Sequence, residues 1–291
     1  MPSLKAIRRR IASVKNTRKI TKAMKMVAAS RLRKAQNAIL ELRPYAIDTH
    51  EVLSSVARRA GEAEVHPLLA RRPPKEVMLV VITSDRGLCG GFNANINRAA
   101  EQYLKSPDHE HEHITLATIG RKGRDYFRRR NKEIRHEFTK IFDDLSYQKA
   151  AEIARVIIAS YTKEHSDLDA VYLVYNEFKS AMTQKLTVEQ LLPITPLPLG
   201  EDEASVDFIY EPSKTALLDR LLPMYVEVEL YRALLESQAS EHGARMTAME
   251  AASNNANDLI GRLTLDYNRA RQAAITKELM EIIGGAEALK G

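Results

Sequence analysis

The C-terminal part of the chain carries one long helical pattern with a narrow apolar stripe. Between Ser213 and Ala288 the only strong helix breaker is Pro223. A helix over this span would be roughly 114 Å long, so it needs a partner helix to cover its stripe. Spacing in steps of three and four is typical of a coiled-coil seam. With Ser253 as its one polar position, the stripe consists of Met246, Met249, Ala256, Ile260, Leu263, Tyr267, Ala270 and Ala274.

A second helical pattern covers residues 3–57. It slips around Arg18–Met24, and such a slip should alter the supercoil locally. Pro44 should kink or interrupt the helix, because proline has no backbone N–H to donate. The apolar stripe consists of Leu4, Ile7, Ile11 and Val14 before the slip, and of Ala28, Leu32, Ala35, Ile39, Leu42, Ala46, Thr49, Leu53 and Val56 after it.

Charge is distributed unevenly between these two segments. Residues 1–34 contain twelve Lys or Arg and no acid, whereas residues 213–291 contain nine basic and eleven acidic side chains. The two segments are therefore electrostatically complementary, and the surplus positive charge is available for an acidic partner. The simplest pairing is antiparallel, because the middle of the chain returns to where it left. The longer C-terminal helix would then extend past the first.

Composition limits the class of protein. Aromatic residues make up only 6% of the chain and Trp is absent, which fits helices with thin seams. Cys89 is the only cysteine, so a reducing compartment is expected and an internal disulfide is excluded. No apolar run is long enough to span a membrane. The N-terminus is Arg-rich and acid-free, as in transit peptides, but its helical pattern continues to Val56 and indicates part of the mature fold.

The middle of the chain alternates strand and helix patterns, which predicts an open α/β sheet. The expected domains are residues 1–60 (N-terminal coiled-coil helix), 61–74 (linker), 75–211 (central α/β domain) and 212–291 (C-terminal coiled-coil helix), with Ser213 as N-cap of the last helix. The expected strands are Val77–Ile82, Ile114–Ile119, Ile134–Phe138, Ala170–Tyr175, Lys185–Glu189 and Val206–Tyr210. Helices are expected from the turn after the first strand to Lys105, over Arg121–Asn131 and over Ser146–His165.

A glycine-rich turn, Thr83–Asn93, follows the first buried strand. A dinucleotide-binding loop would lie at this place. However, the glycines at 87, 90 and 91 match neither that fingerprint nor the Walker pattern. The favoured interpretation is a tight turn that packs the central domain onto the long helices. Cys89 within it is interpreted as a small buried thiol, because no histidine partner is evident.

Two further clusters allow a functional and a structural interpretation. His109, His111 and His113 alternate with glutamates and could bind a metal, but a solvated loop leading into a strand is favoured. Arg121–Lys132 is dense in cations, which fits a solvated helix face or contact with an acidic partner. The basic first helix could also neutralise phosphates of a nucleic acid. Its cations are interleaved with a seam that needs a partner helix, so nucleic-acid binding is not the expected function.

Long segments of the chain resemble the gamma subunit of F-type ATP synthases, the central rotor shaft. Ile11–Ser30 is similar to that family's first helix, and Ser84–Asn93 is similar to its central-domain turn. Ser240–Ser253 and Tyr267–Leu279 are similar to its C-terminal helix. The resemblance implies a long antiparallel two-helix coiled coil with an inserted Rossmann-like α/β domain.

By this resemblance, one copy of the chain would stand inside a ring of three alpha and three beta subunits. With the epsilon subunit it would sit on the membrane c-ring. Proton flow would turn it, and its asymmetry would drive the beta subunits through their conformational cycle. The subunit itself would be non-catalytic, with no cofactor, metal or nucleic acid, and would be peripheral to the membrane.

The resemblance also implies contact residues. Met24, with Lys22 and Lys25, would face acidic loops of the beta subunits, and Arg245 would lie close to the same region. Arg271, Gln272 and Thr276 would contact the ring where a beta subunit grips the helix. The tip would turn in an apolar bearing formed around Ile275, Leu279, Ile282, Ile283 and Ala286.

Location and alternatives follow from the same reasoning. The expectation is a bacterial enzyme at the cytoplasmic face of the inner membrane, with a mature mitochondrial form as the alternative. The cysteine pair of the chloroplast branch is missing, so that thiol switch is not expected. Two other functions are weighed: a Rossmann-like nucleotide-binding enzyme with a coiled-coil arm, and a nucleic-acid-binding hairpin protein.

Overall fold

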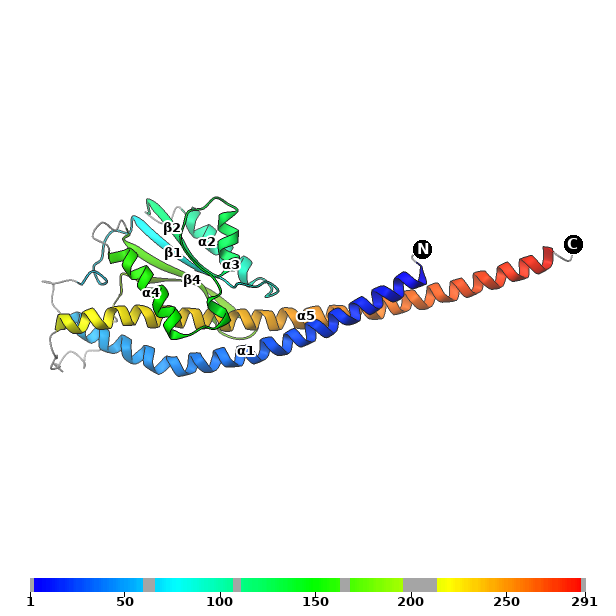
Figure 1. Ribbon diagram of the computed structural model, residues 1–291, viewed down its shortest axis with the longest axis horizontal. Helices are drawn as coiled ribbons and strands as arrows, with labels where there is room; N and C mark the ends of the chain where they lie inside the picture. Colours follow the sequence, from blue (N-terminus) through cyan, green and yellow to red (C-terminus); the bar gives the residue numbers. More distant parts are fainter. Residues whose placement is uncertain (1–2, 60–65, 107–110, 163–167, 196–213, 289–291) are drawn as a thin grey trace. The chain divides into compact units, whose positions relative to one another are not determined.

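The computed structural model describes residues 3–59, 66–106, 111–162, 168–195 and 214–288. Its two longest elements are α1 (Leu4–Arg59) and α5 (Lys214–Ala288), at opposite ends of the sequence (Figure 1). The chain divides into two compact units. One consists of Met1–Ala28 and Met246–Gly291, and the other of Ala29–Arg245. Each unit therefore contains part of both long helices, and the second also contains the α/β sheet.

The second unit contains a mixed sheet with the strand order β3-β2-β1-β4-β5. All neighbouring strands are parallel except β4 and β5, which pair antiparallel. The predicted strand at 206–210 lies outside the described residues. The described strands are β1 (Glu76–Ile82), β2 (His113–Ile119), β3 (Ile134–Phe138), β4 (Ala170–Phe178) and β5 (Gln184–Leu192).

Helices cover both faces of this sheet (Figure 1). Leu79 and Val81 of β1 pack with α2 (Phe92–Lys105) and α3 (Arg121–Arg128). The alternate β1 residues pack with α4 (Tyr147–Thr162) and α5. Because both faces are covered, β1 is fully buried from Val77 to Ile82, as its continuous apolar run predicts. The open α/β sheet is confirmed.

Some helix ends differ from their predicted positions. The helix expected to reach Asn131 ends at Arg128, and Asn131 adopts a left-handed φ of 52°, which an α-helix cannot continue through. Helix α4 ends at Thr162, and residues 163–167 lie outside the described part, as does the predicted N-cap Ser213. A short 3₁₀ helix, η1 (Ile141–Asp143), precedes α4.

The two long helices pair antiparallel, as predicted. In the first unit, Arg18 donates to the Asn257 side chain at 2.7 Å, and Lys25 pairs with Glu250 at 2.6 Å. In the second unit, the Tyr45 hydroxyl lies 3.2 Å from the sulfur of Met224. As the residue number in α1 rises, the residue number of its partner in α5 falls, as expected of an antiparallel pair.

The predicted seams of α1 and α5 are confirmed, but the predicted slip of the α1 seam around Arg18–Met24 is wrong. Every predicted seam residue of α5 is buried or half-buried, as is every one of α1 up to Leu53. The spacing of three and four continues through Arg18, Thr21 and Lys25, and Thr21 is buried. The pattern was interrupted because these seam positions are polar, and not because the helix changes register.

Helix α1 also continues through Pro44 without interruption. The missing N–H leaves the carbonyl of Leu40 without its helical donor. Leu40 and Pro44 both lie on an exposed side of α1, where water can satisfy that carbonyl. The expected interruption is therefore wrong.

Candidate interaction sites

In an open α/β sheet, ligands bind outside the carboxyl ends of the strands, where the strand order reverses. In this sheet that point lies between β1 and β4, because β2 flanks β1 on one side and β4 flanks it on the other. The glycine-rich turn follows β1 directly, and Asn176 and Phe178 lie at the carboxyl end of β4. A nucleotide, if the domain bound one, would occupy the crevice between these segments.

Helix α5 fills that crevice. The Ser240 hydroxyl donates to the carbonyl of Asn176 at 3.0 Å, and the backbone N–H of Phe178 donates to the Glu236 carboxylate at 2.8 Å. On the other side, Arg245 donates to the carbonyl of Gly87 at 3.3 Å. The domain therefore uses its switch point to hold a helix of its own chain.

One turn of α5 in this crevice carries a buried charged cluster. Arg245 pairs with Glu241 at 2.6 Å, with side chains only 12% and 8% exposed. Burial raises the pKa of Glu241, and Arg245 opposes that shift. Burial together with Arg245 and Arg31 lowers the pKa of His242 to about 4, so this imidazole is neutral at physiological pH.

Asp85 of the glycine-rich turn occupies backbone donors at the start of α3 and after β3. Buried Asp85 accepts backbone hydrogen bonds from Arg121 at 3.0 Å and from Lys140 at 3.1 Å. A carboxylate thus occupies the backbone donors that an anionic ligand would need. The side chain of Asn93 bonds Ser84 through both its amide oxygen and its amide nitrogen, at 2.9 and 2.8 Å, which holds the turn together.

Cys89 lies in this turn and is buried, as predicted. Burial raises the pKa of its thiol, and the positive charge of Arg245 opposes that shift. Gly90, with a φ of 57°, adopts the left-handed conformation that glycine tolerates without strain. The turn packs onto α5 through Gly87, in agreement with the structural interpretation of its glycines.

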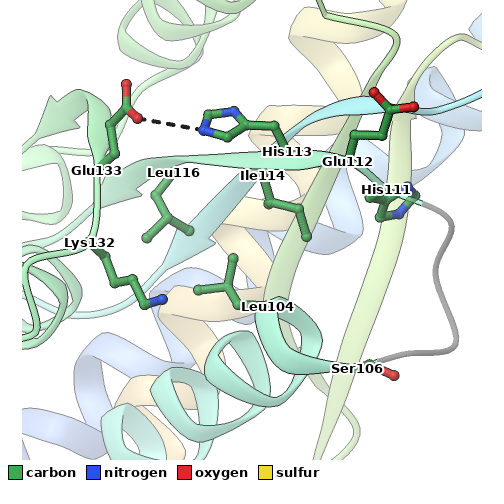
Figure 2. A pocket seen from close by; sticks show the side chains of 9 residues that line it. All are labelled: Leu104, Ser106, His111, Glu112, His113, Ile114, Leu116, Lys132 and Glu133. Atoms are coloured by element: carbon green, nitrogen blue, oxygen red, sulfur yellow. Dashed lines mark ion pairs between the residues drawn. The ribbon is translucent and has the colours of Figure 1, made fainter.

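The histidine-rich segment lies at the opposite, amino-terminal edge of the sheet. His113 opens β2 and contacts Glu76 at 3.1 Å and Glu133 at 3.7 Å, and His109 falls outside the described residues. His113 and Glu133 line a pocket of about 200 Å³. In Figure 2, His113 faces Glu133, and the Lys132 side chain extends toward Leu104. Within the described ranges, no group of three potential metal ligands is present.

The cation-rich segment around α3 is largely paired with acids of its own domain. Arg121 lies 3.5 Å from Asp85, and Arg128 pairs with Glu137 at 2.6 Å. The Arg130 guanidinium stacks over the Tyr126 ring at 3.5 Å. These contacts use much of the charge that could otherwise attract an acidic partner.

The residues expected to contact partners differ in their environment. Lys22 is exposed, whereas Met24 and Lys25 are half-buried, and Lys25 already pairs with Glu250. Arg245 is mostly buried and engaged with Glu241. Arg271, Gln272 and Thr276 are all exposed on α5. Lys22, Met24 and Lys25 therefore lie close together near the polar part of the seam. Arg271, Gln272 and Thr276 are open to solvent.

The end of α5 is an exposed apolar surface. Ala274 is the last half-buried residue of the seam, and within the first unit the helix continues past the start of α1 (Figure 1). The tip residues Ile275, Leu279, Ile282 and Ile283 are 49–69% exposed, Ala286 is exposed, and Met280, which was not predicted, is 63% exposed. Contiguous exposed apolar side chains indicate a surface that is covered by a partner.

Sequence reasoning missed the polar residues with which α5 fills the crevice. Glu236, Ser240, Glu241 and His242 are all buried. A signal was present, because apolar residues occur on every side of α5 between Leu218 and Ala239, which is typical of a helix buried all round. Polar residues that continue such a stretch must find buried partners.

Across the described ranges, no helix combines the length and the apolarity needed to cross a bilayer.

Comparison with known proteins agrees with this architecture. The sequence model of the ATP synthase family matches residues 3–289. The ATP synthase gamma chain of Anaeromyxobacter sp. (strain Fw109-5) is 58% identical, and that of Geobacter sp. (strain M21) is 55% identical. Both alignments cover 100% of each chain.

Solved structures show a similar fold. A chain of the Tetrahymena thermophila mitochondrial ATP synthase central stalk and c-ring is 28% identical, with a TM-score of 0.61. The match covers 80% of this chain and 99% of that one. A rotor chain of the Euglena gracilis mitochondrial ATP synthase is 21% identical and supports the fold alone, with a TM-score of 0.66 over 94% and 98% of the two chains. The chain therefore belongs to the family of ATP synthase gamma chains and serves as the central shaft of a rotary ATP synthase.

Proposed function

We propose that this shaft couples proton flow through a membrane c-ring to the conformational cycle of catalytic beta subunits, without performing chemistry itself. The observation that carries the proposal is the exposed apolar end of α5, which extends from a paired coiled coil. An apolar surface without directional bonds suits a bearing, because it can rotate against its surroundings at little cost. The similar Tetrahymena thermophila structure, a mitochondrial ATP synthase central stalk with its c-ring, supports the c-ring as a partner.

In this proposal, three alpha and three beta subunits surround the coiled-coil segments 1–60 and 212–291. The central domain, 75–211, would face the epsilon subunit and the c-ring beyond the linker 61–74. The complex would lie at the cytoplasmic face of the bacterial inner membrane. A filled crevice and an occupied turn argue against the alternative of a nucleotide-binding enzyme.

The proposed ring contacts fall into two groups. Exposed Arg271, Gln272 and Thr276 are available to polar groups of a partner. Lys22, Met24 and Lys25 would face acidic loops, with Arg245 close to the same region. Met24 places an uncharged side chain among cations, so Met24→Lys would add an ion pair that must break at every step of rotation.

The test is reconstitution with the alpha and beta subunits of the same organism. One copy per hexamer, with faster and cooperative ATP hydrolysis, is the expected result. In the membrane-bound enzyme, Met24→Lys should lower the number of protons pumped per ATP hydrolysed. The matched control Met26→Lys adds the same charge to a residue that is 67% exposed on a different face of α1.

A well-folded chain that does not assemble with these subunits would refute the shaft proposal. Unchanged proton pumping per ATP in Met24→Lys would refute the role of Met24 alone.

A further inference from the structure

A single helical turn of α5, Glu241–Arg245, contacts two loops of the central domain. Arg245 donates to the carbonyl of Gly87 in the turn after β1. On the other side, Gly243 faces the turn between β4 and β5, where an added Cβ would lie 3.2 Å from the Cα and the carbonyl oxygen of Ala181. This approach is close because residue 243 has no side chain. We call this turn of α5 the latch.

We propose that the latch fixes the central domain to α5 against twisting, and that Arg245 is its positioning residue. This inference rests on the proposed coupling function. Arg245 is the last residue of the second unit, and it contacts the domain directly through the carbonyl of Gly87. Torque carried along α5 would pass into the sheet at this residue.

The chemistry of Arg245 suits this role. The guanidinium holds several donors in one rigid plane, so it binds the Glu241 carboxylate at 2.6 Å and the Gly87 carbonyl at 3.3 Å together. Both side chains are almost fully buried, and charge-assisted hydrogen bonds are strong and directional where water is excluded. Lysine, as a point charge on a flexible stem, cannot hold both acceptors in a fixed geometry.

The turn that Arg245 grips is itself rigid. Asn93 at the start of α2 bonds Ser84, two residues after the end of β1, through two hydrogen bonds. The Ser84 hydroxyl also donates to the carbonyl of Arg86. A force applied at Gly87 is therefore passed to β1 and α2, and not absorbed by a loose loop.

Two measurements on Arg245→Lys and Glu241→Gln test the proposal. In the full-length chain, the amide hydrogen-exchange rate of residues 86–91 should rise by about tenfold in both variants. Local opening of the turn must break the buried Arg245–Glu241 pair in the wild type but not in the variants, so opening costs less free energy in the variants. In the assembled membrane enzyme, protons pumped per ATP hydrolysed should fall, with Arg245→Gln falling further than Arg245→Lys.

Two controls separate the latch from general stability. Arg128→Gln breaks an ion pair on the domain surface, where Arg128 is 60% exposed, and should change neither measurement. Leu230→Ala removes buried packing of α5 and should lower stability without lowering the pumping ratio at a temperature where the chain stays folded.

Unchanged exchange in the turn would overturn the latch. Faster exchange with a normal pumping ratio would overturn its role in coupling. If the wild-type chain does not assemble with alpha and beta subunits, the proposed function fails instead, and the exchange experiment still decides whether Arg245 holds the turn. Since Glu241→Gln retains the shape of the side chain, it keeps the test valid if an Arg245 variant does not fold.

Discussion

Helix α5 has three stretches that meet very different surroundings. Between Leu218 and Arg245 it packs against α1 and the sheet, and many of its residues on every side are buried. From Met246 to Ala274 the buried and half-buried residues are those of the seam together with Thr247, Ala248 and Ala252. Beyond Ala274 no described residue of the helix is buried. The same regular backbone therefore carries three sequence patterns, each set by the number of neighbours that cover it.

The comparison also concerns charge. In the first stretch, three glutamates are buried and each accepts from one donor: Glu227 from the Tyr147 hydroxyl, Glu236 from the Phe178 N–H and Glu241 from Arg245. Beyond Ala274, the pair Lys277–Glu281 is exposed to solvent, 3.5 Å apart. Buried pairs are costly to break because one charge is left desolvated, whereas exposed pairs contribute little. Buried polar bonds thus fix α5 where it meets the domain, whereas the polar contacts between α5 and α1 in the first unit, Arg18–Asn257 and Lys25–Glu250, are exposed to solvent and lie beside apolar seam contacts.

The largest expected effect lies in the first stretch. Leu230→Ala should lower the free energy of unfolding by about 2–5 kcal/mol, since Leu230 is fully buried and its removal leaves a cavity. Urea unfolding followed by circular dichroism measures this. The matched control Leu265→Ala, at a position 60% exposed in the second stretch, should cost less than about 0.5 kcal/mol. Equal losses in the two variants would contradict the comparison.

A smaller effect depends on pH. Because His242 has its pKa lowered to about 4, the unfolded chain takes up a proton near pH 6.5 while the folded chain does not. The free energy of unfolding should therefore rise with pH between about 4 and 6.5 and level off above, by at most about 3 kcal/mol. The raised pKa of Glu241 acts in the opposite direction, because the folded chain then holds its proton to higher pH.

The variant His242→Asn isolates the histidine contribution. Urea unfolding at several pH values between 4.5 and 8 should show a flatter rise for the variant than for the wild type. Parallel pH profiles of the two proteins would show that the buried imidazole does not account for the slope.

The smallest of these effects tests the seam. Ile260→Asp places a charge at a half-buried position facing α1, and should cost about 1–3 kcal/mol. The control Leu265→Asp introduces the same charge on the exposed side. Thermal unfolding and assembly of both variants should differ clearly, and a normal melting temperature for Ile260→Asp would place that residue off the seam.

Much of the fold could be predicted because its signals are local. Spacing alone placed Met249, Ala256 and Leu263 on the seam, and an apolar run placed β1 in the sheet. The polar seam residues Arg18 and Lys25 were misread, because a pattern of apolar residues does not register a seam position filled by a cation. Their partners, Asn257 and Glu250, are more than 200 residues away in the sequence, so only the fold reveals the pairing.

The candidate site was less predictable for the same reason. Nothing local to Ser240 or Glu241 indicates that the carboxyl end of β4 and the turn after β1 lie beside them. The motif resemblance placed Arg245 among the contact residues, but it did not indicate a pair within the chain. Contacts formed by tertiary packing leave no periodic pattern in the sequence. The positions of these contacts become clear only once the order of the strands in the sheet is known.

The solitary end of α5 has a consequence for assembly. Isolated helices shorter than about 12–15 residues are marginal in water, and every residue from Ile275 to Ala286 is exposed in the described part of the chain. It also contains Gly284 and Gly285, both with open space around them, and glycine lowers helix propensity by about 1 kcal/mol each. From helix propensity alone, we expect these turns to fray in the free subunit, so that closing a ring around them costs conformational entropy. The affinity of the other subunits for this shaft should therefore depend in part on helix propensity at residues that are exposed to solvent in the free chain.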